Sequence, residues 1–265
     1  MRLKLWLIAT SFYLSGCGLL MDEIETDGYN YSRFSVEYYD HSSLPGPWAG
    51  QRASDVKLTD LSGNVVKLSD HRGKFIVLET ASITCPAYRQ HVQPMNALRR
   101  RYEGEADVVF LVLYVREAHP GKRIGRHMNF AQKLSLARRF DHYVPEETRT
   151  ILIDDLSGTA HRTYGSMPNM AYVISPDFRI LFRSDWTNIE VIENILAHRS
   201  GLPIIDAEHH DPGSGSLIAS INVLLDGGLG AIWDVVINAP EINAAWSRAD
   251  AYYQQHGKLK RSSEE

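Results

Sequence analysis

One cysteine, Cys85, occupies a position in the sequence that favours thiol chemistry. It follows an apolar run, Phe75 to Leu78, that predicts a buried strand, and it precedes a helical pattern from about Tyr88 to Tyr102. A thiol at the start of a helix lies beside free backbone N–H groups and the positive end of the helix dipole, and both lower its pKa. We therefore expect Cys85 to be a nucleophile, and a buried, inert thiol is the alternative.

The second cysteine, Cys17, belongs to an N-terminal targeting segment. Two basic residues precede a short apolar stretch, Leu5 to Tyr13, and Leu14-Ser15-Gly16-Cys17 follows. This pattern resembles a bacterial lipoprotein signal peptide, whereas an ordinary signal peptide or a membrane anchor is the alternative. The resemblance implies a lipid on Cys17 that holds the chain on the periplasmic face of a membrane in the cell envelope. Because no Asp follows Cys17, it also implies sorting to an outer membrane, if the host has one.

Length and composition indicate one sizeable globular domain with extensions. The chain has 265 residues, of which 44% are hydrophobic and 23% charged, and its formal net charge of −4 speaks against nucleic-acid binding. We expect a lipoprotein signal peptide with the lipidated cysteine at 1–17, a Tyr-rich tether at 18–49 and the main domain at 50–200. Residues 201–265 should form a linker and a helical C-terminal extension.

The order of the expected elements predicts an α/β domain with a central mixed sheet and helices on both faces. In chain order we expect a β-hairpin at 56–68, a strand at 75–79, a helix at 88–102, a strand at 108–115, a helix at 129–140, a strand at 151–153, a hairpin at 171–182 and a helix at 189–198. Pro94 should kink the first helix because it lacks a backbone donor. Short helices at 217–225, 230–236 and 241–255 should pack through Trp233 and Trp246.

Three sequence blocks carry a family resemblance. They are Ser82-Ile83-Thr84-Cys85-Pro86 with Tyr88 after it, then Glu117-Ala118-His119-Pro120, and then Ile153-Asp154 followed by Tyr164-Gly165 and Pro168. The hairpin, the strand, the cysteine at a helix start and the late proline together resemble the thioredoxin fold. In their order, the three blocks resemble the iodothyronine deiodinase family over roughly residues 50–195, with cysteine where the animal enzymes have selenocysteine.

The resemblance implies roles for the residues in the first two blocks. Cys85 would attack a soft electrophile, such as an iodine or a peroxide oxygen. His119 would relay a proton or contact a phenolic oxygen of the substrate, and Glu117 would orient it. Ser82 and Thr84 either donate hydrogen bonds to the thiolate or cap the helix. No bound cofactor is expected, and an external thiol has to reduce the oxidised Cys85.

Further positions support or limit this reading. Pro86 continues the cysteine motif, and His127 resembles the second histidine of the family at the start of the next helix. In thioredoxin folds, the proline that corresponds to Pro168 forms a cis peptide beside the catalytic thiol. Met170 stands close to where the animal enzymes have an arginine that grips substrate, which puts an iodothyronine substrate in doubt. Tyr88 occupies the place of a C-x-x-C partner, so dithiol chemistry is not expected.

Three functions remain open from the sequence. The first is a lipid-anchored one-Cys enzyme for reductive dehalogenation, or related thiol chemistry, on a small aromatic compound. The second is a one-Cys peroxidase, because Ser82 lies three residues before Cys85, although Leu78 stands where that family has proline. The third is a non-catalytic binding module of the envelope. Glu208-His209-His210-Asp211 has metal-ligand residue types, but adjacent side chains converge poorly on one ion, so we predict no metal site.

Overall fold

The computed structural model describes residues 28–38, 45–165, 167, 169–199, 207–209 and 217–258. Cys17 and Pro168 lie outside these residues, and so does most of the expected tether. No helix in the described ranges is both long enough and apolar enough to cross a membrane.

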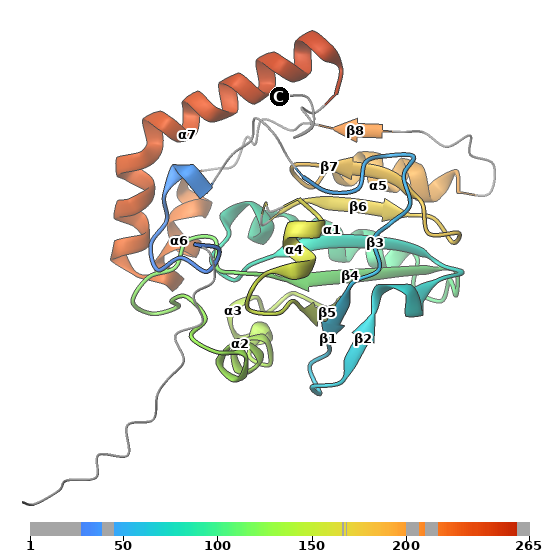
Figure 1. The fold of residues 1–265 in the computed structure, drawn as a ribbon, viewed down its shortest axis with the longest axis horizontal. Coiled ribbons are helices and arrows are strands. Elements are labelled where there is room, and N and C mark those ends of the chain that lie inside the picture. Colours follow the sequence, from blue (N-terminus) through green and yellow to red (C-terminus); the bar gives the residue numbers. More distant parts are fainter. Residues whose placement is uncertain are drawn as a thin grey trace, which may run out of the picture.

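One mixed sheet runs through the domain (Figure 1), and its described strands have the spatial order β2-β1-β5-β4-β3-β6-β7-β8. The strands are β1 (Lys57–Thr59), β2 (Val65–Lys67), β3 (Phe75–Ala81), β4 (Val108–Tyr114), β5 (Thr150–Ile153), β6 (Ala171–Ile174), β7 (Ile180–Ser184) and β8 (Ala207–His209). The neighbours β3, β4 and β5 run parallel, whereas β6 runs antiparallel to both β3 and β7. Apart from β8, each of these strands was expected from the apolar runs and turns.

The helices cover both faces of this sheet. They are α1 (Pro86–Arg101), α2 (Phe130–Ala137), α3 (Phe140–Tyr143), α4 (Thr159–Thr163), α5 (Ile189–Ala197), α6 (Leu217–Gly227) and α7 (Leu229–His256), with short 3-10 turns at Val36–Tyr38 and Leu68–His71. Met95 of α1 and Ile192 of α5 share a core cluster with Val77 of β3. The opposite face of β3, represented by Leu78, packs with Tyr164 just after α4.

The central four strands define the fold class. The unit β3-α1-β4 joins two parallel neighbours through a helix, and the hairpin β6-β7 followed by α5 completes the sheet on the other side of β3. This is the thioredoxin-like arrangement, and it confirms the fold expected from the sequence, with a C-terminal helical extension. Because β3 and β4 are parallel, their carboxyl ends meet at one edge, where α1 begins.

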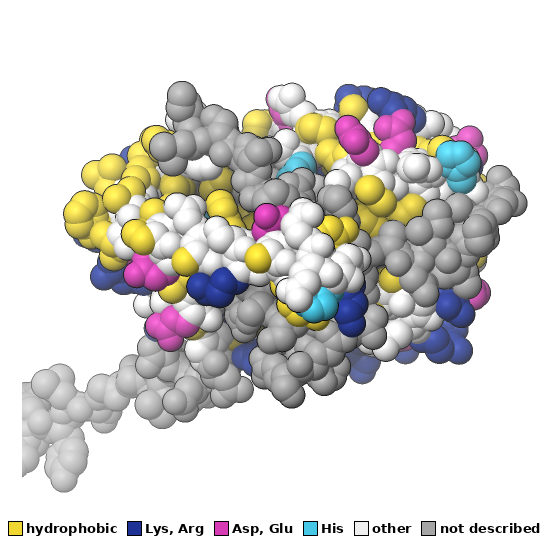
Figure 2. All heavy atoms as spheres, turned by 90° about the horizontal axis from the view of Figure 1, so that it is seen from above, with side chains coloured by type: hydrophobic (Ala, Val, Ile, Leu, Met, Phe, Trp, Pro, Cys, Tyr) yellow, Lys and Arg dark blue, Asp and Glu magenta, His cyan; other side chains and the backbone are white. Residues whose placement is uncertain are grey.

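Three local expectations need correction. The two tail helices expected at 230–236 and 241–255 are one helix, α7, with Pro240 inside it. The expected helix at 129–140 is instead α2 followed by the single turn of α3. Trp233 does not pack into the core, because it is 61% exposed. Figure 2 shows hydrophobic side chains gathered at its left, on the side where Figure 1 places α6 and the start of α7.

Residues 28–38, α6 and α7 pack together around the edge where β3 and β4 end, and we call these three segments the cap. Although residues 28–38 were expected to belong to a tether, Tyr29, Tyr31 and Phe34 are buried. The guanidinium of Arg33 pairs with the buried carboxylate of Asp234 on α7, with Nε 3.2 Å from Oδ2. The N-terminal segment is therefore tied directly to the C-terminal helix.

A close backbone approach joins the cap to the loop after β4. The backbone N–H of Arg123 donates to the carbonyl oxygen of Gly227 at 3.2 Å. A Cβ on Gly227 would lie 2.6 Å from the carbonyl oxygen of His119, and a Cβ on Gly121 would lie 2.1 Å from that of Gly227. Only glycine fits at these two positions, so the turn between α6 and α7 is fixed against the loop that carries His119.

Candidate active site

Cys85 lies at the N-terminus of α1, as the sequence predicts. It is the N-cap residue, its sulfur accepts the backbone N–H of Tyr88 at 3.5 Å, and Pro86 is the first helical residue. Proline suits this position because its missing N–H would have no partner within the helix. Pro94 lies inside α1, which still runs without interruption over 16 residues.

The electrostatic expectation for Cys85 is reversed by its burial. The residue is only 1% exposed. Burial raises the pKa of the thiol to about 12, although the backbone N–H groups of Tyr88 and Ala87 lower it; the charges of Glu117 and Glu79 raise it further. Since a thiolate needs either solvent or positive charge to be stable, the thiol is protonated at neutral pH in this arrangement.

The hydroxyl groups of the cysteine turn bond to a carboxylate, not to the sulfur. Glu117 Oε2 accepts the Ser82 hydroxyl at 3.0 Å, the Thr84 hydroxyl at 2.7 Å and the Thr84 backbone N–H at 2.9 Å. In return, the backbone N–H groups of Ala118 and His119 donate to the Ser82 and Thr84 hydroxyls, respectively. Neither role expected for Ser82 and Thr84 is seen, because they link the turn before α1 to the loop after β4.

Glu117 is the centre of a buried polar cluster. Its Oε1 accepts the Tyr114 hydroxyl at 2.5 Å and lies 3.6 Å from His127 Nε2, which is itself 2.9 Å from the Tyr114 hydroxyl. Burial favours the protonated carboxyl, but hydrogen bonds and charge from His127, together with Thr84 and Tyr114, lower the pKa of Glu117 to about 2. Glu117 is therefore ionised at neutral pH and can orient hydroxyl and imidazole groups.

His119 faces the cap. Its ring lies 4.6 Å from the ring of Phe34, centroid to centroid, and Nδ1 is buried without a hydrogen-bond partner in the described part of the chain. Burial lowers the pKa of His119 to about 4, so the imidazole is neutral at pH 7. Tyr31 belongs to the same segment as Phe34. Burial raises the pKa of Tyr31 to about 12, and a charge on Cys85 would raise it further, so Tyr31 and Cys85 lie within electrostatic reach of each other.

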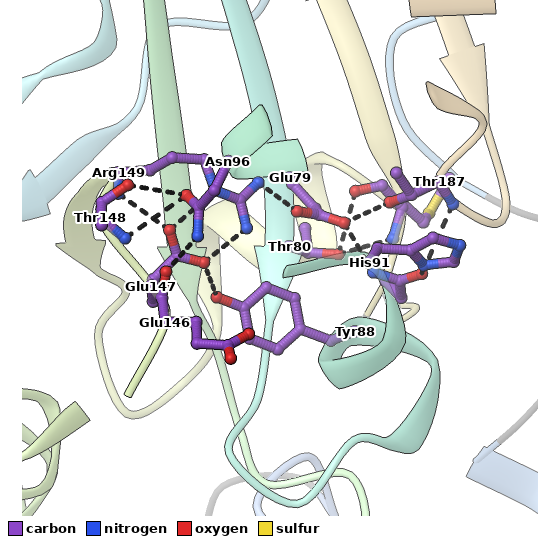
Figure 3. Close-up of polar contacts among 12 residues, drawn as sticks. Glu79, Thr80, Tyr88, His91, Asn96, Glu146, Glu147, Thr148, Arg149 and Thr187 are labelled. Atoms are coloured by element: carbon purple, nitrogen blue, oxygen red, sulfur yellow. Dashed lines mark hydrogen bonds and ion pairs between the residues drawn. The ribbon is translucent and has the colours of Figure 1, made fainter. Parts of the chain in front are cut away.

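A second buried polar cluster surrounds Arg149 and Glu79 (Figure 3). Arg149 donates to the Glu79 carboxylate and, through Nη2 at 2.6 Å, to Glu147, which also accepts the Tyr88 hydroxyl at 2.6 Å. Asn169 donates to the other oxygen of Glu79 at 2.9 Å. Tyr88, in the place of a second cysteine, therefore ties α1 to an ion pair.

Several neighbours of these clusters were missed in the sequence. Lys133 is buried above the Tyr114 ring at 5.7 Å, and burial lowers the pKa of its ammonium to about 8. Asn30 accepts the backbone N–H of His127 at 3.3 Å. Lysine in an amphipathic helix is normally exposed to solvent, so burial of Lys133 is not expected from its sequence position. Asn30 is 97 residues away from its partner, His127. Local patterns contain no signal for either contact.

A surface hollow on α1 is separate from this chemistry. It has a volume of about 670 Å³ and is lined by residues of the second half of α1, such as Pro94 and Arg100, together with Glu146. These positions lie more than two helical turns beyond Cys85. Among the described residues, no group of three or more His, Cys, Asp or Glu side chains is arranged to hold a metal ion.

The topology and the site together define a thioredoxin-like domain with a single cysteine at the start of its first core helix. Residues 48–188, more than half of the chain, match the iodothyronine deiodinase family, and the chain belongs to that family. Thyroxine 5-deiodinases of Sus scrofa and Ovis aries are 26% identical over 157 residues, which cover 50% of this chain and 50% and 52% of theirs. The chain spans about half the length of the curated relatives it matches.

Solved structures resemble the domain more loosely. An uncharacterized conserved protein of Geobacillus kaustophilus has a TM-score of 0.47 at 18% identity, covering 60% of this chain and 85% of its own. A thiol-disulfide oxidoreductase of Bacteroides fragilis has a TM-score of 0.42 at 14% identity, with 56% and 98% covered.

Proposed function

We propose that this chain is a lipid-anchored, one-Cys redox enzyme that reductively dehalogenates a small aromatic compound, or performs related thiol chemistry, with Cys85 as the nucleophile. The observation that carries the proposal is the bonding of Ser82 and Thr84, beside Cys85, to Glu117. Two sequence blocks that resemble the deiodinase family are thereby joined into one site, and the chain belongs to that family.

The reaction balances with two equivalents of an external thiol. The Cys85 sulfur takes the iodine from the carbon–iodine bond, and the carbon, left with the electron pair, takes a proton. A first external thiol attacks the sulfenyl iodide and releases iodide, and a second one frees Cys85 as the external disulfide forms. No second cysteine is available within the chain for this step, since Cys17 would carry the lipid.

The neutral imidazole and the hydroxyls around Glu117 serve to position the substrate. His119 is neutral at pH 7, but with a pKa of about 4 it is a weak base, so we assign it a hydrogen bond to a phenolic oxygen of the substrate. Glu117, with a pKa of about 2, is a poor base, so we assign it the positioning of Tyr114 and His127. Met170 is buried and carries no charge, so a carboxylate-free phenol fits the site better than an iodothyronine.

The test uses the full chain with an iodinated phenol and dithiothreitol, and it measures release of iodide. Cys85→Ser should abolish the release, whereas Cys17→Ser, which removes only the expected anchor, should retain it in detergent. Release that survives in Cys85→Ser would refute the proposal. If peroxide oxidises Cys85 stoichiometrically while the phenol is untouched, the chain is a one-Cys peroxidase. If neither reagent is consumed, it is a binding module.

We also propose that the lipid at Cys17 places the domain on the membrane of the cell envelope, on its periplasmic face. Mass spectrometry of the chain isolated from its membrane should show a diacylglyceryl cysteine at residue 17. An unmodified N-terminus would refute the anchor and leave the chemistry of Cys85 untouched.

A further inference from the structure

An exposed apolar stripe lies on the cap. It consists of Leu229, Trp233, Val236 and Ile237 of α7, which are 77%, 61%, 57% and 50% exposed, with Ile221 of α6 at 39%. The α7 members have the spacing i, i+4, i+7 and i+8, so they share one face of the helix. Figure 2 shows hydrophobic side chains gathered at this end of the molecule. We call these five side chains the apolar face.

The fold does not require the apolar face. Helix α7 already packs inward through other residues: Ile242 joins the main core cluster, and Trp246 lies 6.4 Å from Trp186 in an edge-to-face contact. The outward stripe therefore leaves large side chains in water without a packing reason. Contiguous apolar surface bordered by polar groups usually marks an interaction site.

We propose that the apolar face rests on the lipid membrane that holds the N-terminus of the chain. Only ten residues separate Cys17 from residue 28, where the described N-terminal segment begins, which is ~35 Å at full extension. Tyr29 packs against His161 of α4, and Arg33 further along the same segment pairs with Asp234 of α7. A link of this length lets the lipid on Cys17 and the apolar face reach the same membrane.

Charge beside the apolar face agrees with a membrane surface. Lys122 and Arg123 are exposed, and the backbone of Arg123 bonds to Gly227 at the turn just before α7. A basic pair next to tryptophan and aliphatic side chains suits the interface between anionic headgroups and acyl chains. A second copy of the chain is the alternative occupant, and the test below distinguishes it from a membrane.

The test reads the depth of Trp233 directly. The full chain is bound to vesicles of phosphatidylcholine with brominated acyl chains, with or without phosphatidylglycerol, and bromine quenches only tryptophan that enters the acyl region. The fluorescence of Trp233, obtained as the difference between the parent chain and Trp233→Phe, should be quenched. The quenching should be stronger when phosphatidylglycerol is present. Trp246→Phe is the matched control, because Trp246 faces the domain on the same helix; the emission that it removes should not be quenched.

The proposal rests on the lipid anchor at Cys17 from the proposed function, and it does not depend on the chemistry of Cys85. Three outcomes decide it. Quenching confined to Trp233 supports it. Vesicle-bound chain without quenching of Trp233 overturns it. Lipid-free dimers that Trp233→Ser dissociates, as judged by sedimentation, overturn it in favour of a second copy. Mass spectrometry of Cys17 tests the anchor separately, and iodide release tests the chemistry, so each failure is distinguishable.

Discussion

The Thr84 hydroxyl donates a 2.7 Å hydrogen bond to the Glu117 carboxylate, across 33 residues of sequence. This bond joins the turn before α1 to the loop after β4 and determines which groups surround Cys85. It also makes Glu117 the buried anion on which two hydroxyls, a phenol and an imidazole depend. The consequences can be tested by changing one group at a time.

Replacing Glu117 by glutamine should affect both stability and turnover. The amide keeps the shape of the side chain but removes its charge, and its NH2 group replaces one oxygen, so that either the Thr84 or the Tyr114 hydroxyl loses its acceptor. We expect a loss of about 2–3 kcal/mol in unfolding free energy and, because the positioned groups shift, roughly a hundredfold slower iodide release. Urea unfolding and the iodide assay measure these changes. Glu190→Gln, on the exposed surface of α5, is the control and should change neither. Equal effects in both variants would contradict the role of Glu117.

His119 should make the fold sensitive to acid. Its pKa is about 4 in the folded chain, against about 6.5 when unfolded. A depressed folded pKa gives stability that is present above about pH 6.5 and is lost as pH falls toward 4. His119→Asn should therefore flatten this part of the pH dependence, as measured by urea unfolding across that range. A variant with the same slope as the parent chain would show that His119 is solvated.

Arg149 should be essential for stability. It neutralises the buried carboxylates of Glu79 and Glu147, so Arg149→Met leaves two uncompensated buried anions and should cost about 3–5 kcal/mol. Adding Glu79→Gln to Arg149→Met removes one of those anions and should recover part of the loss. Thermal or urea unfolding of the two variants checks this. If the double variant were no more stable than the single one, the Glu79–Arg149 pair would not be coupled.

The reactivity of Cys85 should depend on the cap. With a thiol pKa of about 12, alkylation by iodoacetamide should still rise with pH well above about 8.5, the ordinary thiol value. Gly227→Ala places a Cβ against His119 and should loosen the cap by about 1–2 kcal/mol, which corresponds to roughly tenfold faster alkylation. Gly230→Ala, near the start of α7 with open space around it, is the matched control. A rate that levels off near neutral pH in the parent chain would mean that Cys85 is a poised thiolate.

Much of the fold was predictable because the signals were local. The continuous apolar run at 108–115 predicted β4, and the cysteine followed by proline marked the start of α1. The boundaries around 129–140 and within the tail were less predictable. There a proline such as Pro240 can lie inside a helix when tertiary packing stabilises the turns on both sides.

The sequence by itself determined the residue types and their order: a lone cysteine at a strand-to-helix turn, a Glu-Ala-His-Pro block after the central strand and the family to which these belong. Only the tertiary structure decided their environment. The bonds of Ser82 and Thr84 to Glu117, the burial that raises the pKa of Cys85 and the packing of Phe34 on His119 all depend on groups distant in the chain. A pKa depends on the solvent and charges around a group, and those are set by the folded chain as a whole.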